Sequence, residues 1–403
     1  MSAGVRAGYK QSEVGVIPED WRTEAVADLV EPTTPICYGV VQVGQYTERG
    51  VPIVAIKFVK EIAHAALHRT AFNLEQPYAR SRPKGGDVLI SIKGTIGRVG
   101  IVPNGFQGNI SRELARLRIR QDTCSEYIAH QLESGATQQR VMQAVVGTTR
   151  LEFSIAALRQ FQLAIPPSNE EQCAIAAALS DVDALLGGLD RLIAKKQGLK
   201  VAAMQQLLTG QTRLPGFSGE WEVKRLGELA HIKTGKRNNE DKVEDGTYPF
   251  FVRSDFVERI NSYSHDCEAI LIPGEGRIGD IFHYIKGRFD VHQRVYAITQ
   301  FQPGVSAKFV HLYMRMHFGA WAMQNTVKAT VDSLRLPTFE NFEMQVPPTE
   351  DEQTAIATIL SDMDTELAAL QARRSKTRAL KQAMMQELLT GRIRLVEPLK
   401  ASA

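Results

Sequence analysis

Three glycines with the spacing Gly-x-Gly-x-x-Gly are the first residues with possible chemistry. Gly274, Gly276 and Gly279 follow an apolar stretch that predicts a strand. In dinucleotide-binding folds, a helix must follow such glycines and present its N-terminus to the phosphates. The residues that come next, DIFHYIKGRFDVH, indicate another strand instead. We therefore interpret the glycines as a tight turn and expect no nucleotide site.

Metal ligands and a catalytic centre are also not expected. His64 and His68 have the spacing of a zinc-binding helix, but the glutamate that would activate water is missing. The cysteines lie far apart, without the C-x-x-C spacing of zinc sites or a disulfide framework, at positions Cys37, Cys124, Cys173 and Cys267. The tripeptide 222–224 resembles the end of a nuclease metal motif without its upstream Pro-Asp. We predict a protein with binding surfaces and no catalysis of its own.

Two Pro-Pro pairs resemble the amide-binding motif of adenine methyltransferases. That motif needs an Asn or Asp before the prolines and an aromatic ring after them, to stack on a flipped base. Here Ile165 and Val346 precede the prolines, and Ser168 and Thr349 follow them. The prolines are better explained as residues that precede helices.

Size and composition indicate a multidomain protein of ordinary solubility. The chain has 403 residues, 43% of them apolar and 23% charged, with a formal net charge of +3. No apolar run approaches the roughly 20 residues that span a bilayer, and the first residues lack the apolar core of a signal peptide. We predict a cytoplasmic protein that does not bind membranes.

Basic residues are concentrated in one stretch. Residues 69–120 contain ten Lys or Arg and three Asp or Glu, an excess of seven positive charges. Such a patch is typical of surfaces that bind a phosphate backbone. Ordinary solvated strand residues could give the same count, so the patch alone does not decide the function.

The chain contains an internal repeat. Residues 165–183 align without a gap with residues 346–364, and the offset of 181 persists to the endings LLTGQTRL and LLTGRIRL. Trp21 and Trp221 open two weaker matches, while the regions between differ greatly. The repeat predicts a globular unit, a helix, a second globular unit and a second helix.

Each repeat predicts a long helix. Ser168 and Thr349 can cap the helices, with Glu171 and Glu352 completing capping boxes. Apolar residues then follow the 4-3 spacing of a coiled coil. They are Ile175, Leu179, Val182, Leu186, Leu189 and Ile193 in the first copy, and Ile356, Leu360, Met363, Leu367 and Leu370 in the second.

Charge predicts how the two helices pair. The first half of each is acidic and the second half is basic. Antiparallel pairing brings opposite charges together and creates a pseudo-two-fold axis, whereas parallel pairing would stack like charges. At 1.5 Å per residue, about 39 residues would form a rod of roughly 58 Å. Gly187 and Gly188 interrupt the first helix, which could mark either a close helix approach or a slight bend.

The predicted fold class is α+β, with two small mixed α/β domains separated by two long antiparallel coiled-coil helices. We expect a first recognition domain at 1–165, a first spacer helix at 166–214, a second recognition domain at 215–346 and a second spacer helix at 347–403. β-like stretches such as Tyr248–Val252 alternate with short helices such as 126–145 in the globular parts.

Over nearly its whole length, the sequence resembles the specificity (S) subunits of Type I restriction-modification systems. The matching segments are YKQSEVGVIPEDW, LISIKGTIGRVGIVP, IPPSNEEQCAIA, VPPTEDEQTAIA and the paired LLTG endings. The resemblance implies two target-recognition domains that each read half of a split double-stranded DNA site. It also implies docking of two methyltransferase (M) subunits and recruitment of restriction (R) subunits. S-adenosylmethionine, ATP and Mg²⁺ would belong to those partners, with no cofactor in this chain.

The recognition domains differ in sequence, so we expect two different half-sites and an asymmetric target. Phosphate contacts would fix position, and a few polar side chains would read base edges. The predicted DNA contacts are Arg80, Arg82, Lys84, Lys93, Arg98 and Arg112 in the first domain, and Lys236, Arg237, Arg253, Arg277, Gln293, Arg294 and Lys328 in the second.

Two alternatives stay open at this point. One is a coiled-coil scaffold that does not bind DNA and carries peptide-docking modules. The other is an independent enzyme, such as a nuclease that acts without partners. Salt-dependent DNA binding would argue against the scaffold, because each neutralised phosphate steepens the dependence of affinity on salt.

Overall fold

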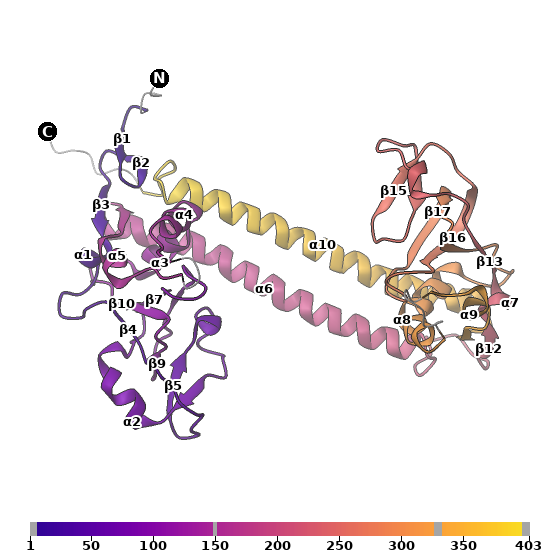
Figure 1. The fold of residues 1–403 in the computed structure, drawn as a ribbon, viewed down its shortest axis with the longest axis horizontal. Coiled ribbons are helices and arrows are strands. Elements are labelled where there is room, and N and C mark those ends of the chain that lie inside the picture. Colours follow the sequence, from indigo (N-terminus) through magenta and orange to yellow (C-terminus); the bar gives the residue numbers. More distant parts are fainter. Residues whose placement is uncertain (1–5, 148–150, 326–332, 397–403) are drawn as a thin grey trace. The chain divides into compact units, whose positions relative to one another are not determined.

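The computed structural model describes residues 6–147, 151–325 and 333–396 (Figure 1). The chain forms two compact units, each described by itself below. Unit 1 comprises residues 1–189 and 373–403, and unit 2 comprises residues 190–372. Each of the two long helices is therefore divided between the units.

Unit 1 contains a four-stranded sheet, a three-stranded sheet and two strand pairs. The sheet orders are β4-β10-β7-β8, β6-β5-β9, β1-β2 and β11-β3. The strands are β1 (Tyr9–Ser12), β2 (Gly15–Pro18), β3 (Arg22–Ala25), β4 (Cys37–Tyr38), β5 (Val51–Val54), β6 (His68–Thr70), β7 (Val88–Ser91), β8 (Val99–Ile101), β9 (Asn109–Ile110), β10 (Leu114–Leu117) and β11 (Gln162–Ile165). The short helices are α1 (Val26–Leu29), α2 (Phe72–Glu75), α3 (Ser125–Glu133), α4 (Gly135–Gln143) and α5 (Ile155–Gln160), with 3-10 turns η1 (Ile56–Phe58) and η2 (Gln76–Ser81).

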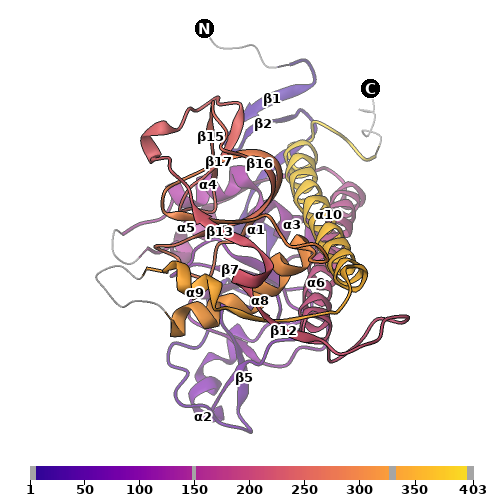
Figure 2. The same ribbon diagram turned by 90° about the vertical axis from the view of Figure 1, so that its right-hand side faces the viewer.

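Unit 2 contains one six-stranded sheet of order β13-β18-β16-β17-β14-β15 and a pair β12-β19. The strands are β12 (Glu222–Arg225), β13 (His231–Thr234), β14 (Tyr248–Phe251), β15 (Val257–Ile260), β16 (His265–Pro273), β17 (His283–Val291), β18 (Val295–Thr299) and β19 (Glu343–Val346). The helices are α7 (Leu226–Leu229), α8 (Ala307–Gln324) and α9 (Leu336–Glu340), with 3-10 turn η3 (Asn239–Asp241). Figure 2 shows this unit with α8 and α9 beside the strands.

The two units share one topology although their sequences differ greatly. Strand order β4-β10-β7-β8 in unit 1 corresponds to β13-β18-β16-β17 in unit 2, and β9-β5-β6 corresponds to β17-β14-β15. The difference is that the long strand β17 is split in unit 1 into β8 and β9, with the segment 102–108 between them. Pro103 and the positive φ of Gly105 explain the interruption, since neither continues a strand easily.

The repeated segments form two continuous helices of 39 residues, α6 (Asn169–Leu207) and α10 (Glu350–Leu388). In unit 1 the start of α6 lies against the end of α10, and in unit 2 the start of α10 lies against the end of α6 (Figure 1). Lys381 of α10 donates to Asp183 of α6 at 2.7 Å. The repeat-equivalent pair, Lys200 and Asp364, also forms a hydrogen-bonded ion pair. The predicted α+β class with antiparallel long helices is confirmed.

The helix starts have the predicted cap residues, but the two glutamates of the predicted capping boxes bind other partners. The Ser168 hydroxyl accepts from the backbone N–H of Glu171 at 3.2 Å, and Thr349 accepts from that of Glu352 at 3.3 Å. The two glutamates do not turn back to close a capping box. Their buried carboxylates accept instead from arginines beyond the opposite helix ends, with Arg213 Nη2 at 2.7 Å from Glu352 and Arg394 bound to Glu171.

The eleven predicted helix-pairing residues are all buried or half-buried. They do not form a uniform seam, however. Ile175 and Leu179 belong to the core of unit 1, together with Trp21. Ile356 and Leu360 belong to the core of unit 2. The helix starts are therefore parts of the globular cores as well as of the helix pair.

Helix α6 is long and apolar enough to cross a membrane by length and composition alone. Such a test is also passed by the helices of many proteins that never meet a bilayer. In α6, the apolar residues Leu189 and Ile193 are buried by packing, and Asp183 and Lys200 form ion pairs with α10. The hydropathy of α6 is therefore weak evidence for a membrane span.

Candidate nucleic-acid interface

The ends of several strands converge at one edge of the unit 2 sheet. The N–H of Arg237 donates to Val291 O at 3.3 Å, and the N–H of Gln293 donates back to Arg237 O at 2.8 Å. The N–H of Gly274 donates to Arg294 O at 2.9 Å. These bonds bring together the segments after β13, β16 and β17. Side chains that are distant in the sequence therefore share one surface.

Glu275 holds two arginines on that surface. Its Oε1 accepts from Arg294 Nη1 at 2.8 Å, and its Oε2 accepts from Arg253 Nη1 at 3.2 Å. The Glu275 side chain is 22% exposed, whereas Arg294 and Arg253 are 58% and 45% exposed. One carboxylate thus orients two guanidinium groups and leaves one net positive charge facing solvent.

Asp290 and His292 fix the backbone of the turn that carries Arg294. The buried Asp290 carboxylate accepts from Ser264 at 2.7 Å and from Ser262 at 2.8 Å. Burial raises the pKa of Asp290, but these hydrogen bonds and those from Val291 and Arg237 outweigh it and lower the pKa overall. His292 Nδ1 accepts from the backbone N–H of Arg294 at 3.0 Å. Burial, and then the neighbouring arginines, lower the pKa of His292, which keeps this acceptor unprotonated.

The other predicted contacts of unit 2 among the described residues lie on the same edge and differ in how their side chains are paired. Arg237 is bound to the buried Asp290 at 3.2 Å and has a structural role. Arg277 is exposed and pairs with Asp255 at 2.6 Å. Gln293 donates its amide to Asn238, and Lys236 is exposed without an ion pair among the described residues. Lys328 lies outside the described residues.

The Gly-x-Gly-x-x-Gly segment is the tight turn that the sequence predicts. Gly276 and Gly279 have φ of 90° and 75°, which favour glycine, and the chain then enters strand β17. Glu275 occupies the position between the first two glycines. Sequence analysis did not select it, because an acidic residue next to predicted DNA contacts appears unfavourable until its two arginine partners are seen.

Unit 1 has the same backbone arrangement. The N–H of Arg112 donates to Val40 O at 3.0 Å, and the N–H of Ile92 donates to Glu113 O at 2.8 Å. The buried Asn109 stands at the repeat position of Asp290, and its Oδ1 accepts from Ser81 at 2.7 Å. The turns 111–113 and 292–294 are therefore equivalent parts of the two units.

The exposed side chains on the unit 1 turn differ from those of unit 2. Arg112 lies beside Glu113 at 3.3 Å. Lys93, at the position of Glu275, pairs with Glu152 at 3.2 Å and lies 6.0 Å from the centre of the Tyr38 ring. The charge at this position is therefore reversed between the two units.

The remaining predicted contacts of unit 1 do not gather on that turn. Lys84 lies before β7, while Lys93 follows the end of the same strand. Arg82 is bound in two places to the buried Glu75, at 2.7 and 2.5 Å, which makes it structural. Arg80 is exposed without an ion pair among the described residues.

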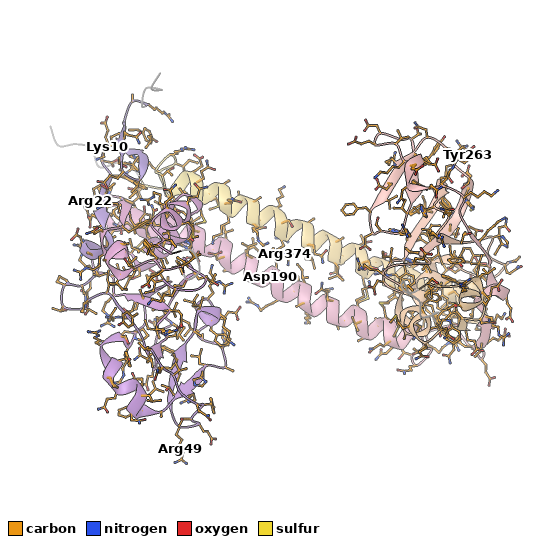
Figure 3. All side chains as sticks on the ribbon, viewed as in Figure 1. Lys10, Arg22, Arg49, Asp190, Tyr263 and Arg374 are labelled. Carbon is orange, nitrogen blue, oxygen red and sulfur yellow. The ribbon has the colours of Figure 1, made fainter. Side chains whose placement is uncertain are left out.

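Arg98 faces a different hollow of unit 1. It lines a cleft of about 580 Å³ together with Lys57, Lys60 and Lys381. Lys60 and Lys381 already pair with Glu133, at 2.6 and 3.9 Å. Sequence analysis did not select Lys57 and Lys60, although they lie close in the sequence to the basic patch. It also did not select Arg49, on an exposed loop of unit 1 (Figure 3).

One group of side chains in unit 1 has the composition of a metal site. The ligand atoms of His130, Glu133 and Asp183 lie within 4.8 Å of one another. The ammonium of Lys381 already pairs with both carboxylates of this group, at 2.7 Å from Asp183 and 3.9 Å from Glu133. Burial and then Lys381 lower the pKa of His130, whose Nε2 lies 3.1 Å from the Ser180 hydroxyl. We read the group as an ion-pair network that joins α3 to both long helices.

Comparison with known proteins decides the family. The family model described as Type I restriction modification DNA specificity domain matches residues 18–194 and again residues 218–377, which is most of the chain. The chain belongs to this family. The predicted resemblance is confirmed, and each match of the specificity-domain model covers one recognition region and most of the long helix that follows it.

Related proteins of described function support the same family. The chain is 26% identical over 226 residues to the Type I restriction enzyme EcoBI specificity subunit of Escherichia coli, covering 55% of this chain and 46% of that protein. It is 23% identical to the type I restriction enzyme MjaX specificity subunit of Methanocaldococcus jannaschii, covering 96% and 97%. The matches to EcoBI and to the EcoDI specificity subunit of Escherichia coli span less than half of those two proteins.

A solved structure supports the specificity-domain fold. The crystal structure of a Type I restriction-modification system S subunit from Mycoplasma genitalium superposes with a TM-score of 0.65 and 15% identity, covering 91% of this chain and 96% of that one. A second solved structure, described as the structural basis of complex assembly and conformational transition of the type I restriction-modification system, gives a TM-score of 0.54 at 16% identity. At such identities, these likenesses concern the fold alone.

Proposed function

We propose that the chain is the DNA-specificity subunit of a Type I restriction-modification complex and binds an asymmetric, bipartite site in double-stranded DNA. The observation that carries the proposal is the pair of equivalent turns, 111–113 and 292–294, which have matching backbones and different polar side chains. A protein that reads two different half-sites needs a constant frame with variable contact residues.

The turns are proposed to contact base edges, and the unpaired basic residues are proposed to contact phosphates. Lys84, Arg98 and Lys236 are exposed and have no ion pair among the described residues, so their charges are available to DNA. Arg82 and Arg237 are bound to buried carboxylates and act by supporting the surface. This division refines the sequence prediction, which treated all of them as direct contacts.

The long helices are proposed to set the distance between the half-sites and to dock two methyltransferase subunits, with restriction subunits joining that core. Leu192 and Leu199 of α6 are 39% and 49% exposed and are seven residues apart, so they lie on one side of the helix. Exposed leucines at this spacing suit a protein partner. S-adenosylmethionine, ATP and Mg²⁺ are assigned to the partners, catalysis is theirs as well, and we place the complex in the cytoplasm.

The proposal is tested with the full chain, co-purified with a methyltransferase subunit from its host. Methylated adenines in the host genome are mapped by single-molecule sequencing. One bipartite, non-palindromic site is expected, and it should disappear when the chain is deleted and return when it is restored. Methylation independent of the chain, or DNA binding without salt dependence, would favour the protein scaffold.

Spacing is tested by removing seven residues from each helix at equivalent positions, 187–193 and 368–374. Removing a full heptad from both helices preserves the 4-3 pattern of the pair. It shortens each helix by roughly 10 Å at 1.5 Å per residue. The gap between half-sites should change while both half-sites stay the same. A gap identical to that of the wild type would contradict the role of the helices as a spacer.

A further inference from the structure

The two units provide an internal comparison of which positions are constrained. Residues that support the turns have similar types in both units, as in Asn109 and Asp290, or Ile110 and Val291. All four are buried. The pairings are equivalent too, since β5 pairs in parallel with β9 through Asn109 and β14 pairs in parallel with β17 through Asp290.

The half-buried and exposed positions of the same turns show the opposite behaviour. Glu113 is replaced by Arg294 at the repeat offset, and Lys93 is matched by Glu275 at the equivalent position of the preceding turn. Both substitutions reverse a charge. Packing cannot explain the reversal at Arg294, because its side chain is 58% exposed and Asp290 and His292 hold the turn through backbone N–H groups, including that of Arg294. The side chains on this turn are free to vary while the backbone is held.

We propose that Arg294 is a specificity-determining residue that recognises a guanine in the half-site of unit 2, with Glu275 as its positioning residue. This inference rests on the proposed DNA-specificity function. A guanidinium can donate two parallel hydrogen bonds to O6 and N7 of guanine in the major groove. Glu275 engages only Nη1 of Arg294, so other N–H groups of Arg294 remain for a base.

The surroundings of Arg294 favour a base edge over a phosphate. The Glu275 carboxylate lies 2.8 Å from Arg294 and also binds Arg253, so it offsets part of the positive charge that would attract a phosphate to Arg294. A guanine edge is neutral and is recognised through its two acceptors, so it does not depend on that charge. The carboxylate also restricts the rotamers of a long side chain before binding, which lowers the entropy cost of recognition.

The first experiment selects DNA from a randomised duplex library with the full chain, alone and with its co-purified subunits, for wild type and Arg294→Ala. The wild type should prefer guanine at one position of one half-site. The variant should lose that preference by about tenfold or more at this position only, which is the usual size for a bidentate contact. The other half-site, read by unit 1, should not change.

A matched control is Arg288→Ala. Arg288 is 52% exposed and pairs with Asp266 at 2.9 Å, so it resembles Arg294 in exposure and pairing. It also lies over the ring of Tyr263, which is labelled in Figure 3. It lies on strand β17 rather than on the turn, and its removal should leave every base preference intact. If both variants weaken binding to all sequences equally, Arg294 contacts phosphate and the inference is wrong.

A second pair of variants separates positioning from recognition. Arg294→Lys keeps the charge without the bidentate geometry, so guanine preference should still fall. Glu275→Gln keeps Arg294 but removes the charge that orients it, so the same position should show a smaller loss. Preference for guanine unchanged in Arg294→Lys would overturn the inference. A wild type that selects no sequence in either preparation would instead contradict the proposed function.

The equivalent turn of unit 1 allows a gain-of-function test. Lys93→Glu combined with Glu113→Arg recreates the Glu275–Arg294 arrangement on a matching backbone. The half-site of unit 1 should then gain a preference for guanine at one position, and the half-site of unit 2 should be unchanged. A melting temperature close to that of the wild type checks that the variant folds. A folded variant with an unaltered half-site would count against recognition by this turn.

Discussion

Units 1 and 2 share a topology but treat their charges differently. Unit 2 pairs its exposed arginines with acids on the same edge, as in Arg294 with Glu275 and Arg277 with Asp255. Unit 1 leaves Arg80, Lys84 and Arg98 exposed without an ion pair among the described residues. The same frame can therefore carry a surface of oriented side chains or a surface of free positive charge. What the units share stabilises the protein, and what differs between them is available for recognition.

The largest expected effect comes from the arginines that neutralise the buried helix-start glutamates. Arg394→Ala and Arg213→Ala should each cost about 3 kcal/mol of stability, because an unpaired buried carboxylate remains. The Arg394 variant should lose more, since Arg394 also binds Asp20 at 2.9 Å. Urea unfolding gives the totals, and hydrogen exchange shows which unit opens. Lys196→Ala, which removes an exposed pair with Glu366, should cost less than 1 kcal/mol.

If only one of the two arginine variants is destabilised, the helix starts are not equivalent. Opening should be confined to β11 and the start of α6 for Arg394→Ala, and to β19 and the start of α10 for Arg213→Ala. Faster hydrogen exchange in unit 2 for Arg394→Ala, or in unit 1 for Arg213→Ala, would contradict the assignment of each ion pair to one unit.

Acid should destabilise unit 2 more than unit 1. Burial lowers the pKa of His311 to about 4, and it also lowers the pKa values of His292 and His317 in the same unit. Because the neutral form is favoured in the folded state, stability is full above about pH 6.5 and falls as pH drops towards the folded pKa. His311 alone should cost about 2 kcal/mol at pH 5. Hydrogen exchange at pH 7 and pH 5 measures the loss, and His311→Gln should reduce it.

In unit 1, His130 has a lowered pKa for the same reason, burial, with Lys381 as the next cause. Its protonation would also release part of the network that joins α3 to the long helices. Equal acid sensitivity in both units would mean that protonation of His311 does not dominate the loss of stability in acid. Protonation of His130 in unit 1 would then matter as much as that of His311 in unit 2.

A smaller effect is expected on the salt dependence of DNA binding. Arg98→Ala in unit 1 and Lys236→Ala in unit 2 should each reduce the slope of log affinity against log salt by about 0.9, if each contacts one phosphate. Base preferences should not change. Arg22, on β3, pairs with Glu24 and serves as the control (Figure 3), and its alanine variant should leave the slope unaltered. Fluorescence anisotropy at several salt concentrations measures the slopes.

The smallest effect concerns the one conspicuous difference between the long helices. A Cβ at Gly188 would meet nothing within 4 Å, so the structure does not require glycine there for a close approach. Gly188→Ala should therefore stabilise α6 by roughly 0.5–1 kcal/mol, as in other helix interiors. Thermal unfolding measures the change, with Ala369→Gly in α10 as the reciprocal variant. A destabilised Gly188→Ala would indicate that α6 uses its glycines to bend.

Much of the fold follows from the sequence because the repeat is so regular. The offset of 181 residues and the reversed charges of the helix halves predict antiparallel helices, as found in the Asp183–Lys381 and Asp364–Lys200 pairs. The tight turn at Gly276 and Gly279 also follows, because only a strand could continue after it. These features depend on residues that are close in the chain or repeated along it.

The shared topology of the two units could not be predicted, since strand pairing depends on contacts between distant residues. Asn109 and Asp290 lie at the repeat offset, but their different residue types did not identify them as supports of equivalent turns. A list of basic residues could not separate Arg82, bound to buried Glu75, from the exposed Arg80 two residues earlier. Whether an arginine is free depends on acids that folding brings to it.

Unit 1 is assembled from both ends of the polypeptide, whereas unit 2 is one continuous segment. The Tyr9 hydroxyl donates to Gly391 O at 3.1 Å. The buried Glu171 carboxylate gains its ion-pair partner only when Arg394 has been synthesised. On the ribosome, the unit that is translated second can therefore finish folding while the nascent first unit still lacks its last helix turns. Premature termination near residue 372 would release a chain whose later half is complete and whose earlier half is not.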